Sequence, residues 1–144
     1  DVLVHVVEHC CLSETFTTVA FTEMLARTTH PIAHAVVQSL LADEVDHGRV
    51  GWAYLAERAK AGRLQCVAAA LPDVFVRTVA PAMKPAELNA SDDDPANERW
   101  GYLAPKTIAT IYRSALHEVV VPGFAEFGID TRDARRALEA KGWA

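Results

Sequence analysis

The chain has 144 residues, of which 51% are hydrophobic, and its formal net charge is −5 at pH 7. A chain of this length can bury a hydrophobic core without covalent cross-links. Its acidic balance offers no stripe of Lys and Arg to neutralise phosphates, so binding to nucleic acid is not expected.

Two long helices are expected in the first sixty residues. Apolar residues recur at helical spacing from Val2 to about Arg27, and a second helical stretch runs from Pro31 to Ala61. Pro31 fits the first position of a helix, and Gly62 supplies a C-terminal stop. The short break between the stretches predicts an antiparallel hairpin. The residues of the second helix expected to face the first are Ala33, Val37, Leu40, Glu44, His47, Gly51 and Tyr54.

Shorter elements follow the hairpin. A third helix is predicted from residue 64 to about 71, where Pro72 bends or ends it, and it resumes over residues 73–79. Residues 81–104 are rich in Pro, Asp, Asn and Ala, a composition that predicts a loop or linker.

The last forty residues become periodic again. Helices are predicted from Pro105 to Pro122 and from Thr131 to about Lys141, the latter capped by Asp130 or Thr131 itself. The sequence therefore predicts an all-α fold. Its three parts are a helical hairpin with the following helix (1–80), a linker (81–104) and C-terminal helices that pack on the bundle (105–144).

Glu14, Glu44 and His47 stand out because of their distance from the turn. Glu14 lies fifteen residues before Thr29, the centre of the turn, and Glu44 lies fifteen residues after it. Since each helical residue advances about 1.5 Å, antiparallel helices place the two carboxylates at the same level. His47 projects from the same face as Glu44, one turn along. This spacing predicts half of a carboxylate-bridged site for two metal ions.

Three sequence segments resemble the ferritin-like di-iron carboxylate superfamily, in particular bacterial ferritin-like domain proteins. They are CCLSETF, which contains Glu14, LLADEVDHGRVGWAYL, which contains Glu44 and His47, and ALHEVVVPGFAEFGI near the C-terminus. The resemblance implies a four-helix bundle in which each of two helix pairs provides one Glu and one Glu-x-x-His. It further implies two iron ions, or iron and manganese, in an oxidase, oxygenase or ferroxidase that uses O2 and a small substrate.

The sequence contains one such half site only. No second Glu-x-x-His follows, because His117 has no Glu three residues before it. Either an N-terminal half precedes Asp1, or two copies form a homodimer and each contributes half of the ligands. A first residue other than Met favours the N-terminal half. If neither completes the site, no bound metal is expected.

Further residues are candidates for the surroundings of the site. Asp43 precedes Glu44 and either orients the imidazole of His47 or is simply solvated. Tyr54, Phe21 and Trp52 are candidates for a pocket near bound oxygen or substrate, although such a Tyr is more often part of a core.

Another metal motif is interpreted as a chance match. His5, Glu8 and His9 follow the His-x-x-Glu-His order of inverted zinc-protease motifs. No scaffold for a protease cleft precedes them, and His5 points about 180° away from Glu14 around the helix.

The alternative function is a metal-free helical protein that dimerises or serves as a scaffold for a partner. In that case Glu14 and Glu44 are protonated, solvated or paired with Arg58 or Lys60.

The three cysteines, Cys10, Cys11 and Cys66, are expected to be reduced thiols of a cytoplasmic protein. No stretch of eighteen residues is free of charged or polar breaks, so no membrane association is expected.

Overall fold

The computed structural model describes residues 1–84 and 94–143, and this part of the chain is all-helical, with no strand. The predicted all-α fold is confirmed. The helical elements are α1 (Val2–Val6), the π-helix η1 (Val7–Ser13), α2 (Glu14–Arg27), α3 (Pro31–Lys60), α4 (Gln65–Met83), the 3-10 helix η2 (Pro95–Trp100), α6 (Pro105–Ala115), the π-helix η3 (Leu116–Val120), α7 (Val121–Ala125) and α8 (Arg132–Glu139).

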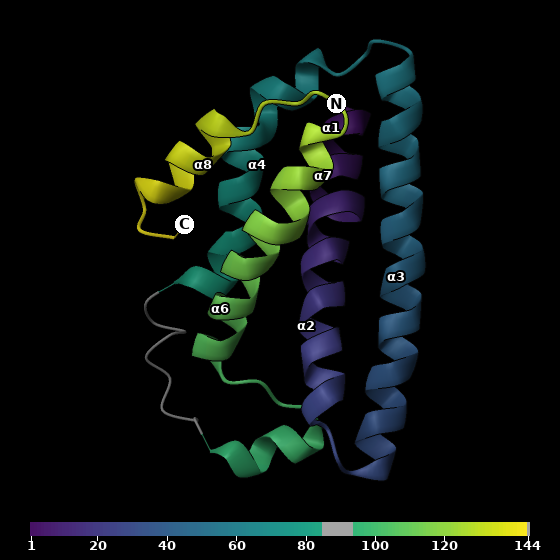
Figure 1. Ribbon diagram of the computed structural model, residues 1–144, viewed down its shortest axis with the longest axis vertical. Helices are drawn as coiled ribbons and strands as arrows, with labels where there is room; N and C mark the ends of the chain where they lie inside the picture. The colour runs from purple at the N-terminus through teal and green to yellow at the C-terminus, as the bar shows by residue number, and fades with distance from the viewer. Residues whose placement is uncertain (85–93, 144) are drawn as a thin grey trace.

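The predicted hairpin is present. The elements α1, η1 and α2 follow one another as a single rod, and α3 runs antiparallel beside it (Figure 1). The backbone N–H groups of Thr29 and His30 donate to the carbonyl of Arg99 in η2, at 3.2 and 2.9 Å, so η2 anchors the turn. Gly62 follows α3 with a φ of 68°, a conformation that glycine adopts without steric cost.

A π-helical segment, η1, interrupts the first rod, and the sequence analysis missed it. The hydroxyl of Ser13 donates to the carbonyl of Glu8, five residues earlier, at 3.0 Å. A π turn holds more residues than an α turn, so it changes the direction in which later side chains project. Glu14 is the first residue after η1 and begins α2.

The proline residues do not end helices where the sequence analysis expected. Helix α4 continues through Pro72 and Pro81, so of the two alternatives for Pro72, a bend or an end of the helix, the end is wrong. A proline in a helix removes one backbone hydrogen bond, but the burial of Leu71, Val74 and Phe75 holds α4 together on both sides of Pro72. The C-terminal helical stretch likewise passes Pro122 and ends with α7 at Ala125.

The segment predicted as a linker over residues 81–104 is partly helical. Helix α4 extends into it as far as Met83, and η2 lies within it. The predicted loop residues 85–93 lie outside the described residues. The final short helix is confirmed as α8, where Asp130 Oδ1 accepts a hydrogen bond from the backbone N–H of Arg132 at 2.9 Å.

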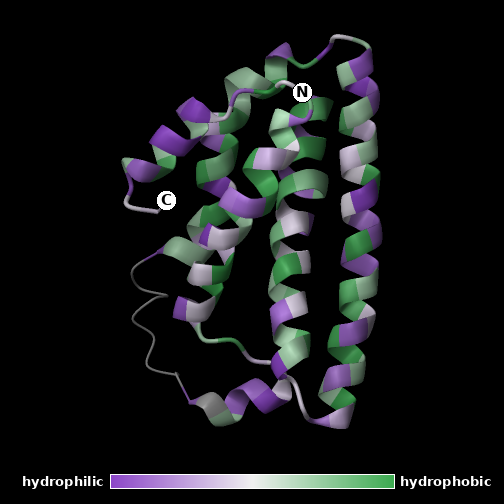
Figure 2. Ribbon diagram, in the orientation of Figure 1, coloured by the Kyte–Doolittle hydropathy of each residue, from purple (hydrophilic) through white to green (hydrophobic). Residues whose placement is uncertain are grey.

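The main core lies on one side of the α1–α2 rod. It forms between this rod, α4, the stretch from α6 to α7, and α8, which Figures 1 and 2 show side by side, and it includes Leu55 of α3. Its largest fully buried side chains are Phe16, Phe75, Phe124, Leu12, Leu55, Leu71, Met83, Leu116 and Leu138. Helix α4 contributes strongly to this core and is also long and apolar enough to cross a membrane by length and composition alone.

Helix α3 lies at the edge of the bundle. Only Val37, Gly48, Gly51 and Leu55 of its thirty residues are buried. In the predicted inner row of α3, Val37 and Gly51 are buried, whereas Leu40 is exposed. His47 is also exposed, although its imidazole lies 4.0 Å from Glu14 of the first rod, as the prediction requires. The reason is that α3 packs mainly on η1 and α2, with further contacts to η2 and, through Trp52, to Phe124 and Phe127.

Two glycines of α3 allow us to test this contact. A Cβ atom added at Gly51 would collide with the carbonyl group of Cys10, whereas one at Gly48 would meet nothing closer than the Cβ of Glu14 at 3.7 Å. We expect Gly51→Ala to lower the free energy of unfolding by about 1–3 kcal/mol, because α3 and η1 must separate. Gly48→Ala, the matched control, should be neutral or stabilising by up to about 1 kcal/mol. Urea unfolding of both variants makes the comparison, and equal stability would contradict the close approach.

Candidate metal centre

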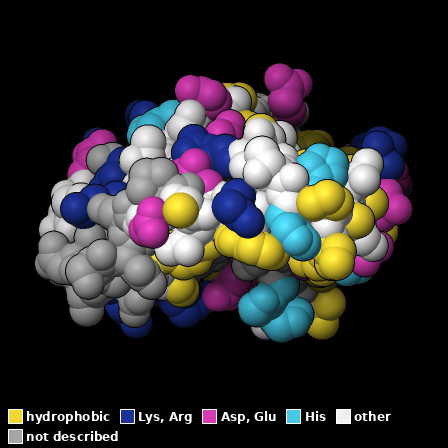
Figure 3. Space-filling view, turned by 90° about the horizontal axis from the view of Figure 1, so that it is seen from below, with side chains coloured by type: hydrophobic (Ala, Val, Ile, Leu, Met, Phe, Trp, Pro, Cys, Tyr) yellow, Lys and Arg dark blue, Asp and Glu magenta, His cyan; other side chains and the backbone are white. Residues whose placement is uncertain are grey.

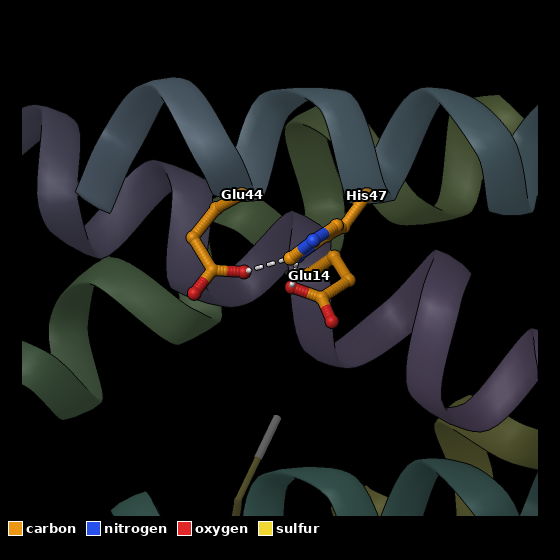
Figure 4. Close-up of side chains that lie close together, drawn as sticks. All are labelled: Glu14, Glu44 and His47. Atoms are coloured by element: carbon orange, nitrogen blue, oxygen red, sulfur yellow. Dashed lines mark ion pairs between the residues drawn. The ribbon is translucent and has the colours of Figure 1, made fainter. Parts of the chain in front are cut away.

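Three side chains from two helices meet on the hairpin. Glu14 comes from α2, and Glu44 and His47 come from α3, as Figure 4 shows. Each offers one ligand atom, and these atoms lie within 4.8 Å of one another. The Nδ1 atom of His47 is 3.6 Å from Glu44 Oε2 and 4.0 Å from Glu14 Oε2. The predicted alignment of Glu14 with Glu44 and His47 is thus present in the structure.

The spacing of these atoms suits a metal ion. Separations of 3.6 and 4.0 Å are too long for hydrogen bonds, which join N and O atoms at about 2.7–3.2 Å. Two ligand atoms that each lie about 2.0–2.2 Å from one ion are at most about 4.4 Å apart. The imidazole and the two carboxylates therefore fit a shared cation with small side-chain movements.

The electrostatics of the cluster also favour a cation. The pKa of Glu14 is raised to about 7, first by burial and then by the adjacent Glu44 carboxylate, while His47 acts in the opposite direction. The side chains of Glu14 and Glu44 are 23% and 22% exposed, whereas that of His47 is 64% exposed. A bound cation would replace the proton that Glu14 holds near neutral pH.

Small residues and one polar contact position the three side chains. Gly48 and Gly51 let α3 approach the first rod at Glu14 and Cys10, respectively. The indole N–H of Trp52 donates to the hydroxyl of Thr15, the residue after Glu14, at 3.0 Å. The sequence analysis missed Thr15 and Gly48 as positioning residues. The spacing of Gly48 and Gly51, one turn apart, is the signal that could have indicated a close helix contact.

The other candidate pocket residues have separate partners. Trp52 packs on Phe124 at a ring-centroid distance of 5.3 Å, in addition to its bond to Thr15. The hydroxyl of Tyr54 accepts a hydrogen bond from Arg58 at 2.6 Å. Phe21 is half-buried in α2, and Asp43 is exposed on α3.

The pairings considered for a metal-free protein are not those observed. Arg58 bonds Tyr54, and Lys60 pairs with Glu57 at 2.6 Å, so neither cation neutralises Glu14 or Glu44 through these contacts. The negative charge of the cluster is balanced within it only by His47, when this side chain is protonated.

The His-x-x-Glu-His segment has a different arrangement from a catalytic site. Both oxygens of Glu8 accept hydrogen bonds from Arg77, at 2.9 and 2.7 Å, and this pairing lowers the pKa of Glu8. A carboxylate held in this way is a poor base. His5 and His9 lie together with a ring-centroid distance of 4.3 Å.

The cysteines are free thiols. Cys11 is buried, and its burial raises the pKa of its thiol to about 12, so it is not a reactive nucleophile. A metal cluster needs at least three His, Cys, Asp or Glu side chains close together. Within residues 1–84 and 94–143, Glu14, Glu44 and His47 are the only such group.

Comparisons of the chain with protein-family models, with curated proteins and with solved structures find no match. The resemblance to ferritin-like proteins therefore stays a prediction that depends on the residues quoted above.

The raised pKa of Glu14 predicts a pH-dependent stability. Because the folded state holds this proton more tightly than the unfolded state, the contribution of Glu14 to the free energy of unfolding is lost as pH rises from about 4.5 to about 7. Glu14→Gln cannot lose a proton. We compare the free energies of unfolding of this variant and of the unmodified protein by urea unfolding in chelator. The difference in favour of the variant should be about 1–3 kcal/mol larger at pH 8 than at pH 4.5.

Glu8→Gln serves as the control, because the pH dependence of its stability should run in the opposite direction. The pKa of Glu8 is lowered, so its contribution to stability is present above about pH 4.5 and is lost as pH falls. This variant should be less stable than the unmodified protein at pH 8. A stability difference for Glu14→Gln that does not change with pH would contradict the proposed environment of Glu14.

Proposed function

We propose that the protein binds redox-active divalent metal at Glu14, Glu44 and His47, as half of a dinuclear carboxylate site. The observation that carries this proposal is the convergence of two carboxylates and one imidazole from two helices, with ligand atoms within 4.8 Å of one another. Four-helix proteins with dinuclear iron sites use Glu residues and a Glu-x-x-His pair in this way.

The donor set indicates which metals to expect. Carboxylates favour hard ions such as manganese, and imidazole favours iron and zinc, so the mixed set suits iron or manganese. None of the three ligands is a thiol, as a site selective for copper(I) would require. We propose two iron ions, or one iron and one manganese, as the cofactor.

The three residues can supply only part of the ligands that two ions need. His47 is 64% exposed, so the cluster is open on the side away from the bundle. A second chain or an N-terminal half must therefore provide the remaining ligands, as in sites built from facing helix pairs.

The function proposed for the completed site is that of an oxidase, an oxygenase or a ferroxidase. When bound, two ferrous ions supply the electrons for the reduction of O2. Glu14 and Glu44 provide negative charge, and Glu14 releases its proton to make its carboxylate available as a ligand. His47 has to be neutral to act as a donor, and its exposed edge leaves a route for O2 and a small organic substrate.

A second candidate function is metal-free dimerisation or a scaffold role. The observation that favours it is the exposure of large apolar side chains of α3, namely Ile32, Val36, Leu40 and Val50. A protein of this kind would gain no stability from divalent metal.

Metal titration tests the proposed site. We expect one divalent ion per chain when chelator-treated protein receives Mn2+, or Fe2+ without oxygen, as measured by calorimetry and metal analysis. Glu44→Ala and His47→Ala should weaken binding at least about tenfold, since each removes one of three ligands. At a metal concentration about 100 times the dissociation constant, the metal should add about 2.7 kcal/mol to the free energy of unfolding.

The matched control is Asp46→Asn. Asp46 is an exposed carboxylate on the same helix and pairs with Arg49 at 3.0 Å, outside the cluster. This variant should bind Mn2+ as the unmodified protein does. If Asp46→Asn and Glu44→Ala weaken binding equally, the metal is attracted by the general acidity of α3 and the proposed site is wrong.

A further inference from the structure

We infer that two copies of this chain pair through antiparallel α3 helices about a two-fold axis at Asp43, and that divalent metal drives the pairing. This inference rests on the proposed metal site, and it identifies the second copy as the source of the remaining ligands. Three features of α3 support it: a long exposed apolar stripe, the symmetric placement of four of its members and the position of the proposed metal ligand His47 within it.

The stripe consists of residues that share one side of α3. Successive helical residues are about 100° apart, so these residues lie within about 40° of a common line along the helix. Its apolar members Ile32, Val36, Leu40 and Val50 are between 42% and 71% exposed. Figure 3 views the end of the molecule near the α2–α3 turn, where hydrophobic and histidine side chains lie next to one another. The members of the stripe are Ile32, Val36, Leu40, Asp43, His47, Val50 and Tyr54.

Four members of the stripe are placed symmetrically about Asp43, whereas Leu40 and His47 would meet Asp46 and Ser39 of the other chain. Ile32 lies eleven residues before Asp43 and Tyr54 eleven after it, and Val36 and Val50 lie seven residues before and after it. In an antiparallel pair with its axis at Asp43, Val36 of each chain therefore meets Val50 of the other. Ile32 likewise meets Tyr54. A two-fold interface requires this self-complementarity, in which residue i contacts residue j and j contacts i.

The centre of the pair is acidic. Asp43 would face its own copy, and Glu44 is one residue from the axis in each chain. The carboxylates of Asp43 and Glu44 then approach their counterparts, which opposes pairing unless cations bind between them. His47 lies within the stripe, so the half sites of the two chains adjoin at the centre of the pair.

The size of the interface makes pairing depend on the metal. Helix α3 has 30 residues, which gives a length of about 45 Å. A contact along a helix about 10 Å wide buries about 450 Å² per chain, or about 900 Å² in total. This area is below the roughly 1,200–2,000 Å² of stable interfaces. The apolar stripe alone would give a weak dimer. Metal ions bound by ligands from both chains would supply the additional binding free energy.

The first experiment measures molecular mass with and without metal. Sedimentation velocity of the chain in chelator should give a monomer, and saturating Mn2+ should give a dimer. Calorimetry under the same conditions reports Mn2+ bound per chain, and it tests the metal site separately from the pairing.

Two charge substitutions test the stripe. Val36→Glu and Val50→Glu place a carboxylate on exposed positions of the predicted contact, so the folded chain should tolerate them. Each should weaken the Mn2+-dependent dimer at least about tenfold. Val119→Glu is the matched control, because Val119 is also exposed, at 44%, but lies on η3, outside the stripe. This variant should dimerise as the unmodified protein does.

Cross-linking tests the register. Chains with Val36→Cys are mixed with chains with Val50→Cys in Mn2+ and treated with a short bismaleimide. The mixture should yield cross-linked heterodimers, whereas each variant alone should yield at least about tenfold less. The unmodified chain reports any background from Cys10 and Cys66.

The possible results separate the two proposals. Mn2+ bound by a chain that remains monomeric would overturn the pairing and leave the metal site standing. A dimer that forms equally in chelator would overturn the metal-driven interface on α3. A dimer that is not weakened by Val36→Glu and Val50→Glu would overturn it as well. A monomer that binds no Mn2+ would overturn both the pairing and the metal site.

Discussion

The close approach of α3 to η1 and α2 is the contact on which the rest of the candidate site depends. Gly51 leaves space for the backbone of η1 at Cys10, and Gly48 leaves space for Glu14 one turn away. Trp52 fixes the same region by its bond to Thr15 and its packing on Phe124. Helix α3 buries only four of its thirty residues, and it makes most of its contacts with α2 and η1. The distance between Glu14 and the pair on α3 therefore depends on how α3 packs on these two elements.

The site and the stable core lie on different parts of the α1–α2 rod. Residues such as Leu12 and Phe16 face α4 and α6 and are almost fully buried, whereas Glu14 lies beside α3 and retains access to solvent. Two neighbouring carboxylates, with the pKa of Glu14 near 7, cost folding free energy at neutral pH. A protein tolerates such a local cost more easily where it does not weaken the core, and functional sites commonly carry costs of this kind.

The sequence was sufficient to predict the hairpin and the alignment of Glu14 with Glu44, because both follow from helical periodicity and from counting residues to the turn. It was not sufficient for η1, since no residue pattern distinguishes a π turn from an α turn. It also left open whether Pro72 ends the helix, which it does not, because burial of Leu71 and Phe75 outweighs the loss of one hydrogen bond. The exposure of Leu40 and His47 could not be predicted either. Periodicity shows that one side of a helix is apolar, but it does not show whether another element covers that side.

The exposed side of α3 combines two properties, an apolar stripe and part of a cluster of potential metal ligands. A metal-free scaffold could use the apolar residues Val36 and Val50, but it would have no need for the Glu44 carboxylate, which raises the pKa of the adjacent Glu14. A metal site complete within one chain would need Glu14 and Glu44, but it would not need an apolar stripe that runs on for several turns beyond them. His47 belongs to both features, because it lies within the stripe and within 4.0 Å of both carboxylates. A single partner surface that brings both apolar side chains and metal ligands accounts for the two properties together.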